Sequence, residues 1–390
     1  MKSQEDQQPQ SKNPGNLKEV FLLFLWMGFT AFGGPAAHVA IFHDQVVVKR
    51  KWIDEQRFLD LLGASQLIPG PNSTEMCIHL GFLRAGWPGL ILGGMGFILP
   101  STLIVLALAW AYARFGSAPQ IEWVLYAVKP VVIAIILNAI WSLRKKAVKD
   151  VYTGVIALAA ILLNIFGFNN IILLIGGGIL LAIVKWFWQH RGTRLSILPF
   201  IPLASIPGLQ TPAQGFSLST LFLTFLKIGS VLYGSGYVLL AFLRSEFVQG
   251  LGWLTDQQII DAVAIGQVTP GPLSTAATFL GYVLGGVPGA LLATLGMFLP
   301  SFLLVILTYP LIPRMRESRF FSAFLDGVNA SSLGLMAVVA WQLAMAAFVD
   351  APSILLGILS LVLVVFARLN TTWIILGAVI FGLGRYLLGL

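Results

Sequence analysis

The sequence contains little charge and almost no cysteine. Only 10% of its 390 residues are charged, whereas 57% are hydrophobic and the mean hydropathy is +0.86. Soluble globular domains carry about 25% charged residues, so this composition excludes an ordinary soluble protein and indicates an integral membrane protein. The single cysteine, Cys77, excludes an intramolecular disulfide and carries no information about the redox state of the compartment.

The sequence also lacks the motifs of several enzyme classes. It has no glycine-rich nucleotide-binding loop, so ATP is not expected to supply energy directly. His38, His43, Asp44, Glu75 and His79 do not have the spacing of a dedicated metal site, so no metal or other cofactor is expected. The net charge of +8 arises from basic residues in short loops between apolar runs, where membrane orientation explains them better than a nucleic-acid partner does.

What the sequence does contain is apolar runs long enough to cross a hydrocarbon core of about 30 Å, for example residues 91–110, 171–184 and 291–307. Lipid offers no partners for open backbone groups, and no alternating barrel pattern is present, so these spans are predicted to be α-helices. Residues 1–16 are polar and lack the features of a cleaved secretory signal, so we expect a disordered tail there.

The sequence contains an internal repeat at an offset of about 200 residues, which predicts two homologous halves. We expect a first membrane repeat at residues 17–189, a linker at 190–214 and a second repeat at 215–390, each repeat beginning with one long helix. A short amphipathic segment then ends at Pro-Gly-Pro, and a short helix and four further apolar helices follow. The matched sets include Gly28, Gln66, Pro69, Gly70, Pro71, Ser73, Thr74 and Ser101 with Gly229, Gln267, Pro270, Gly271, Pro272, Ser274, Thr275 and Ser301.

The topology depends on whether each Pro-Gly-Pro segment crosses the membrane or turns back. If it turns back, sixteen of the 24 Lys and Arg residues fall on one face and six on the other; a crossing segment gives almost no bias. Because cytoplasmic loops carry an excess of Lys and Arg, the re-entrant topology is favoured. The predicted fold is thus an all-α integral membrane protein whose halves form an inverted-topology repeat, each with about five spanning helices and one Pro-Gly-Pro re-entrant hairpin. Both termini are expected on the extracytoplasmic side.

The segment QLIPGPNSTE, residues 66–75, predicts a binding site. Two prolines without amide hydrogens and a glycine without a side chain end one helix and begin the next. The first amides of the new helix have no helical acceptor and carry the positive end of the helix dipole, so they form an anion site. Inverted symmetry is expected to bring both tips together near the midplane around a small tetrahedral oxyanion. The predicted substrate-binding residues here are Pro69, Gly70, Pro71, Asn72, Ser73, Thr74, Pro270, Gly271, Pro272, Ser274 and Thr275.

The alternative is that each Pro-Gly-Pro simply terminates two packed helices, with Ser and Thr as caps. Gly33, Gly34 and Gly234 are added to the predicted site, because they allow an ion to approach the backbone closely, although small-residue helix packing also explains them. Lys129, beside Pro130 in an apolar helix, either neutralises a dianion or extends to the membrane surface. Glu75 either couples a proton to anion movement or pairs with the helix dipole.

Several motifs in combination resemble the chromate ion transporter family: FTAFGGP at residues 29–35, the paired QLIPGPNST and QVTPGPLST, the GWPG and GVPG elements, and LPS written twice. The resemblance runs from about residue 17 to the end. It implies a two-domain carrier of the bacterial inner membrane that exports chromate, with sulfate as a second candidate. The symmetry is incomplete, because the first half's Phe-Gly-Gly-Pro at residues 32–35 corresponds to Tyr-Gly-Ser-Gly at 233–236.

The leading hypothesis is therefore a secondary transporter that moves a small divalent oxyanion by alternating access, and not an enzyme. A sulfate carrier or a passive anion channel of the same architecture is the alternative, and an intramembrane enzyme is a distant one. The expected partners are the oxyanion and the lipid bilayer. The sequence leaves the oligomeric state open, with a homodimer among the options.

Overall fold

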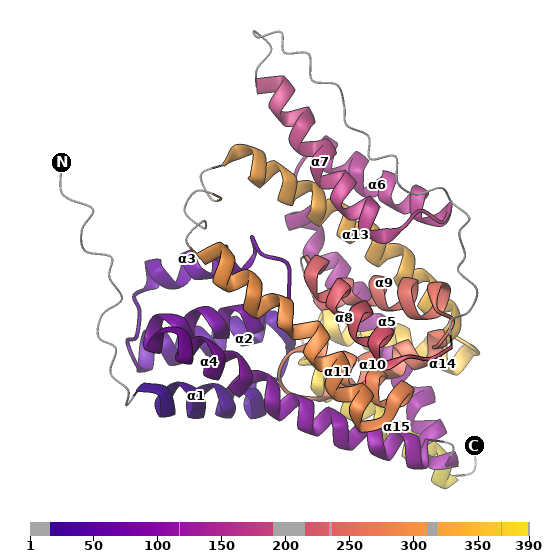
Figure 1. Cartoon of the computed structure of the whole chain (residues 1–390). Helices are drawn as coiled ribbons and strands as arrows, with labels where there is room; N and C mark the ends of the chain where they lie inside the picture. Colours follow the sequence, from indigo (N-terminus) through magenta and orange to yellow (C-terminus); the bar gives the residue numbers. More distant parts are fainter. Residues whose placement is uncertain are drawn as a thin grey trace, which may run out of the picture.

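The computed structural model describes residues 16–116, 118–189, 215–233, 236–309, 315, 318–367 and 369–388. Every regular element in these ranges is a helix (Figure 1). The predicted linker at 190–214 and all but the last residue of the predicted tail lie outside the described residues. The predicted all-α architecture is confirmed.

The same series of helices is found in both halves. The first half consists of α1 (Asn16–Thr30), α2 (Gly34–His43), η1 (Asp44–Lys49), α3 (Glu55–Ser65), α4 (Asn72–Phe115), α5 (Pro119–Ala147), α6 (Val151–Ile165) and α7 (Asn170–Gln189). The second consists of α8 (Leu218–Val231), η2 (Gly236–Val238), α9 (Leu239–Leu243), η3 (Arg244–Gly250), α10 (Asp256–Val268), η4 (Leu273–Thr275), α11 (Ala276–Thr308), α13 (Arg319–Ala347), α14 (Ala351–Val365) and α15 (Thr371–Leu388).

The first helix of each half is interrupted, so the prediction of one long helix there is wrong. In the first half α1 ends at Thr30 and α2 begins at Gly34, and Gly33 between them has a φ of 102°. In the second half α8 ends at Val231, and helical structure resumes at Gly236. Irregular backbone inside a membrane needs partners, because lipid supplies none. At these two breaks the protein itself must therefore supply hydrogen-bond partners for the free carbonyl and amide groups.

The long helices α4 and α11 each fold back on themselves. Ala85 and Gly86 have non-helical torsion angles, and Gly86 has a φ of 65°, which favours glycine. The short arm, residues 72–84, and the long arm, residues 87–115, then lie so close that a Cβ at Gly93 would stand 2.6 Å from the carbonyl oxygen of Cys77. Gly285 and Gly286 repeat this turn in α11. Each half thus carries the predicted Pro-Gly-Pro hairpin, formed in the first half by α3 and the short arm of α4.

The two halves are interleaved rather than separate. Within each half the first helix packs on the long arm, as α1 does on α4 and α8 does on α11. A Cβ added at Gly28 would meet Pro100, so this crossing needs glycine. Helix α13 of the second half packs against α5, α6 and α7 of the first, and α5 packs against α14 and α15 (Figure 1). These contacts join the two halves into one bundle.

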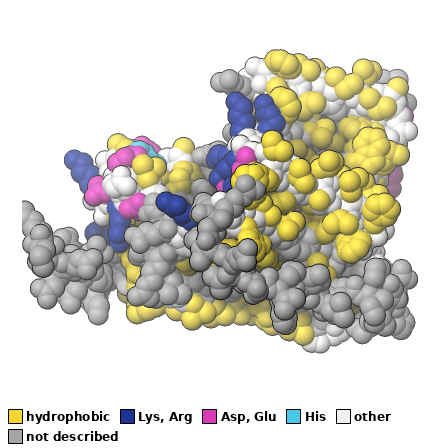
Figure 2. Space-filling model, turned by 90° about the horizontal axis from the view of Figure 1, so that it is seen from above, with side chains coloured by type: hydrophobic (Ala, Val, Ile, Leu, Met, Phe, Trp, Pro, Cys, Tyr) yellow, Lys and Arg dark blue, Asp and Glu magenta, His cyan; other side chains and the backbone are white. Residues whose placement is uncertain are grey.

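Six helices among the described residues are long and apolar enough to cross a membrane, and α6, α8 and α14 are shorter apolar helices. Large hydrophobic side chains face outward along them, such as Trp341, Leu355 and Ile380, as expected for a surface in contact with lipid. Figure 2 shows hydrophobic side chains over much of one view of the molecule, with Lys and Arg gathered over a smaller part of it. The chain is a multi-pass membrane protein.

Candidate functional site

Each Pro-Gly-Pro tip binds the break in the first helix of the opposite half. The amide of Gly70 donates to the carbonyl of Leu232 at 2.6 Å, and the amide of Gly271 donates to the carbonyl of Ala31 at 3.0 Å. Both pairs occupy equivalent positions in the repeat, so the contact is exchanged symmetrically. Gly70 and Gly271 have φ values of 145° and 95°, which L side chains rarely adopt. The tips and the breaks therefore form one structural unit that spans both halves.

Backbone donors are left over at both tips. In the first, the amides of Thr74 and Glu75 donate to the carbonyl of Pro71, at 2.8 and 3.1 Å, as the first turn of α4 forms. The two amides before them have no acceptor within the helix and point out of its amino end. At the second tip the Thr275 amide donates to the Pro272 carbonyl at 3.0 Å, which leaves the amides of Leu273 and Ser274 in the same situation.

His38 connects the two tips. Its Nε2 lies 3.1 Å from the carbonyl oxygen of Ala31, and its Nδ1 lies 2.9 Å from the hydroxyl of Ser73. A carbonyl oxygen can only accept, so Nε2 carries a proton, and in the neutral ring Nδ1 accepts from Ser73. The Ala31 carbonyl also accepts from Gly271. A chain of three hydrogen bonds thus joins Ser73 of the first tip to Gly271 of the second.

The serines of the two LPS elements reach the opposite tip. The hydroxyl of Ser101 lies 2.9 Å from that of Thr275, which donates to the Pro272 carbonyl, so Ser101 is the donor. Ser301, the equivalent of Ser101, lies against Gly70. The Ser301 hydroxyl is buried and has no hydrogen-bond partner among the described residues. Sequence reasoning found these serines only as part of a repeat, and no local signal connected them with the tips.

Glu75 is fully buried beside the first tip. Its Oε1 is in contact with the position that a Cβ would take at Gly70, next to the Ser301 hydroxyl. Neither oxygen of Glu75, nor the hydroxyl of Thr74, has a hydrogen-bond partner within the described part of the chain. A buried carboxyl group without a partner is costly in its charged form. The first tip therefore has unused polar groups where the second has Ala276, the repeat counterpart of Glu75.

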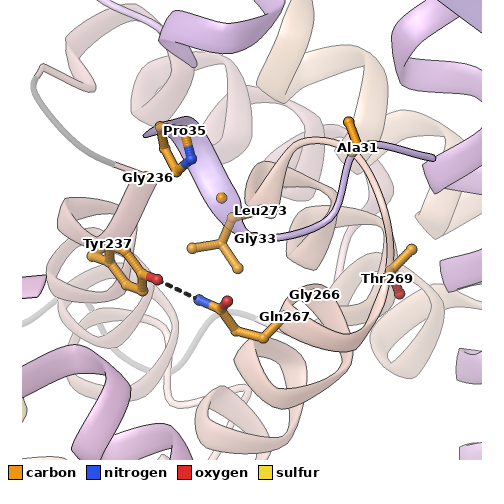
Figure 3. A pocket seen from close by; sticks show the side chains of 11 residues that line it. Ala31, Gly33, Pro35, Gly236, Tyr237, Gly266, Gln267, Thr269 and Leu273 are labelled. Carbon is orange, nitrogen blue, oxygen red and sulfur yellow. Dashed lines mark hydrogen bonds between the residues drawn. The ribbon is translucent and has the colours of Figure 1, made fainter. Parts of the chain in front are cut away.

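A small pocket lies between the breaks and the second tip (Figure 3). It is lined by Gly33, Gly34, Pro35 and Ala31 of the first half, and by Gly236, Tyr237, Gly266, Gln267, Thr269, Gly271 and Leu273 of the second. Its volume of about 20 Å³ is room for about one water molecule. The side chain of Leu273 lies in the middle of the group. Gln267 donates to the Tyr237 hydroxyl at 2.9 Å. The pocket as it stands is therefore too small for a tetrahedral oxyanion.

The predicted site residues are only partly brought together. Of the predicted residues, Gly33, Gly34 and Gly271 line the pocket. The other predicted residues of the two tips do not line it. Gly234 lies outside the described residues. Lys129 lies elsewhere, in a second pocket, where its Nζ is 3.4 Å from Oδ1 of Asp261. His38, Ser101, Ser301 and Gln267 join the site without having been predicted for it.

Interrupted helices that bond to one another inside a bundle of apolar helices are typical of membrane transporters. The family model described as "Chromate transporter" matches this chain twice, at residues 18–183 and 219–383. The chain belongs to the chromate transporter family, and the predicted resemblance is confirmed. Its family is one of transporters, which also confirms that the chain is not an enzyme.

Individual relatives cover nearly the whole chain. It is similar to the chromate transport protein of Cupriavidus metallidurans, with 33% identity over 95% of this chain and 93% of the relative. Similarity to the probable chromate transport protein of Synechococcus elongatus is 33% over 89% of each chain. The chromate transport protein of Pseudomonas aeruginosa is 34% identical over 88% of this chain and 85% of its own length. No solved structure matches the chain.

Proposed function

We propose that the protein exports chromate across the bacterial inner membrane by alternating access and holds the dianion between the two Pro-Gly-Pro tips. The single observation that carries this proposal is the reciprocal bonding of each tip to the opposite half, Gly70 to Leu232 and Gly271 to Ala31. The family and its relatives support chromate as the substrate. Sulfate as a second substrate, extracytoplasmic termini and a homodimer stay predictions.

The chemistry of the tips suits a small oxyanion. Free amides at the amino ends of α4 and of the helix that begins at Leu273 carry partial positive charge, and Leu273 and the amino end of α2 line the first pocket. The Thr74 hydroxyl, which bonds to no described residue, adds a donor to these amides, whereas the hydroxyls of Ser73 and Thr275 already donate to His38 and to the Pro272 carbonyl. A tetrahedral dianion accepts several hydrogen bonds at once, and charge-assisted bonds are about twice as strong as neutral ones.

The small size of the pocket favours a carrier over a passive channel. A channel needs a continuous aqueous path, whereas the pocket here has a volume of about 20 Å³ and Leu273 fills its centre. An oxyanion enters only if a tip moves away from the break that holds it. Because each break belongs to the other half, movement of one half against the other opens the two tips in alternation. A carrier of this kind saturates and can accumulate its substrate against a gradient.

Chromate uptake into everted membrane vesicles tests the site, with sulfate as a competitor. Ser73→Ala and Ser274→Ala each remove one hydroxyl at a tip, and we expect both to lower transport at subsaturating chromate. Ser360→Ala is the matched control, because Ser360 is also a buried helical serine but donates only to the Leu356 carbonyl of α14. Equal transport by wild type, Ser73→Ala and Ser274→Ala would remove the proposed site.

A labelling experiment tests the proposed orientation. A cysteine is placed at Ser3 in a chain that carries Cys77→Ala, so that only the amino-terminal tail can react. If both termini are extracytoplasmic, a membrane-impermeant thiol reagent labels intact cells whose outer membrane it can pass. Protection in intact cells, with labelling only after lysis, would reverse the orientation.

A further inference from the structure

A second and larger pocket lies between α4, α5 and α10, away from the residues that line the first. Its volume is about 420 Å³, and Lys129, Glu122, Tyr112, Asp261, Gln257 and Gln258 contribute its polar groups. A water molecule takes about 30 Å³ of liquid volume, so the pocket has room for a small oxyanion together with water. Helix α10 connects it to the second tip, because Asp261 stands on this helix and Pro-Gly-Pro follows at its end.

The pocket contains a loosely formed ion pair. Nζ of Lys129 is 3.4 Å from Oδ1 of Asp261, and this oxygen is buried without a hydrogen bond from any described residue. The hydroxyl of Tyr112 donates to Oδ2 at 2.9 Å. Asp261 is 2% exposed, whereas the Lys129 side chain is 18% exposed and lines the pocket. A buried ion pair offsets the cost of desolvation only when its geometry is close, and this pair is not close. An ammonium group also carries several N–H donors, so Lys129 has donors left for another anion.

This pair occurs in only one half. Asp60 occupies the position equivalent to Asp261 but is partly exposed on α3. Helix α13 has the same length as α5, and Asn329 stands on it where α5 has Lys129. The pair is therefore not part of the duplicated scaffold that builds the tips. Ionisable groups inside a membrane are expensive, and a buried pair without a repeat counterpart points to a specific task.

We propose that this pocket is a second oxyanion site, in which Lys129 binds the anion and Asp261 takes up a proton from the buffered solvent when the anion displaces its carboxylate from the pair. The inference rests on the proposed transport of a dianion. With Asp261 and Glu122 ionised, the pocket has one positive and two negative groups and repels a dianion. A proton on Oδ1 of Asp261 removes one negative charge and releases Lys129. The amide group of Gln258 adds a donor, because its Oε1 already accepts from the Thr255 amide at 2.9 Å.

Besides Glu122, which lines the same pocket, several charged groups near Asp261 have partners of their own. On α10, Asp256 accepts from Arg244 of η3 at 2.8 Å. Tyr126 donates to Asp350 at 2.6 Å and accepts from Arg385 of α15 at 3.2 Å. The hydrogen bond from Tyr126 and those from Ser353 hold the pKa of Asp350 below its ordinary value, so Asp350 stays charged. Helix α11 carries no charged residue, and Asp326 of α13 pairs with Lys149 at 2.5 Å. Of the two acids that line the pocket, Asp261 is thus the one that is paired with Lys129.

Calorimetric titration of chromate into the purified full chain in lipid nanodiscs tests the proposal, with sulfate titrated in parallel. Titrations in two buffers of different ionisation enthalpy give the number of protons taken up per anion. Because chromate itself takes up a proton near neutral pH, the comparison is between variants. We expect Asp261→Asn to bind about one proton fewer per anion than wild type, and its affinity to lose a pH dependence of up to about tenfold per pH unit. Lys129→Gln is expected to weaken binding at least tenfold, and Asp60→Asn, the repeat-matched control, to behave as wild type.

The outcomes separate this inference from the proposed function. If wild type binds neither anion and moves no chromate into vesicles, the transport proposal itself fails. If wild type binds chromate but Asp261→Asn keeps the same proton uptake, only the second site is overturned. If Asp261→Asn does not fold, Tyr112→Phe serves instead. It removes the donor to the charged carboxylate, so the pH at which affinity is half-maximal should rise, and an unchanged midpoint overturns the inference.

Discussion

The two Pro-Gly-Pro tips share a backbone but differ in what surrounds it. At the second tip the polar groups are paired, since Ser101 donates to Thr275, and the neighbouring position is Ala276. At the first tip the equivalent hydroxyls of Ser301 and Thr74 are unpaired among the described residues, and Glu75 stands beside them. The two tips thus share one backbone geometry, and a buried carboxyl group stands beside only one of them.

The largest expected effect comes from adding a methyl group to the tip glycines. A Cβ at Gly70 would overlap Glu75 and Ser301, and Gly70 has a φ of 145°; at Gly271 the Cβ would lie 2.9 Å from that of Ser101. Strained backbone of this kind costs about 1–3 kcal/mol, or roughly a five- to 150-fold loss of transport if the active conformation bears it. We expect Gly70→Ala to be the more damaging, in chromate flux into proteoliposomes and in thermal unfolding.

The control for the tip glycines is Gly176→Ala, because Gly176 is helical and nothing lies within 4 Å of the Cβ position. If Gly70→Ala and Gly176→Ala transport equally well, the first tip is not under the constraint described, and the comparison between the tips loses its basis.

The next effect concerns Glu75, the residue that most distinguishes the tips. Coupling of one proton would make wild-type flux change by up to about tenfold per pH unit in the coupled range. We expect Glu75→Gln to keep chromate binding and to flatten this dependence, because an amide cannot titrate. Flux is measured at saturating chromate at every pH, so that changes of affinity at Asp261 do not enter.

Asp60→Gln is the control for Glu75, since Asp60 is a partly exposed acid on the neighbouring α3. Unchanged pH dependence in Glu75→Gln would reject proton coupling and leave Glu75 as a partner of the α4 dipole. The difference between the tips at Glu75 would then make no contribution to the pH dependence of transport.

A residue of this site could be predicted from the sequence only where a local sequence pattern marks it. The tips were predictable because Pro-Gly-Pro interrupts a helix locally and occurs at the same position in both halves. The breaks after α1 and α8 were missed, because apolar residues continue across Phe32 and Tyr233 and the glycines there also suit helix packing. Ser101, Ser301 and Leu232 were not predictable, since their partners lie more than 150 residues away and no local pattern connects them.

The charged residues show the same limit. Lys129 was recognised as a costly charge inside an apolar helix and was assigned either to a dianion or to the membrane surface, whereas the structure pairs it with Asp261. Nothing in the neighbourhood of Lys129 identifies Asp261 as that partner, because only the packing of α10 against α5 brings them together. A lone histidine such as His38 gives still less information, because an isolated histidine on an apolar helix has no preferred role.

A smaller effect is expected at His38, which links the tips and has Leu239 as its repeat counterpart. His38→Leu removes the hydrogen bonds to Ser73 and to the Ala31 carbonyl, and leaves polar groups buried without one partner, at a cost of about 1–3 kcal/mol. We expect lower thermal stability and roughly tenfold slower transport if the link orders both tips. His43→Leu, which removes a partly exposed pair with Glu55, is the control. Equal transport by both variants would show that the tips work without the link.

The smallest effect distinguishes the paired serine from the unpaired one. Ser101→Ala removes one hydrogen bond, which contributes about 0.5–1.5 kcal/mol, while Thr275 keeps its own bond to the Pro272 carbonyl. Ser301→Ala removes a hydroxyl that bonds to no described residue, so its unfolding temperature should stay the same or rise. We expect the opposite order in transport, because an unpaired buried donor at the first tip is available to substrate. Ser101→Ala should therefore lose more thermal stability and Ser301→Ala more chromate flux. If Ser301→Ala loses stability and flux together, Ser301 is a structural residue and both tips are equally filled.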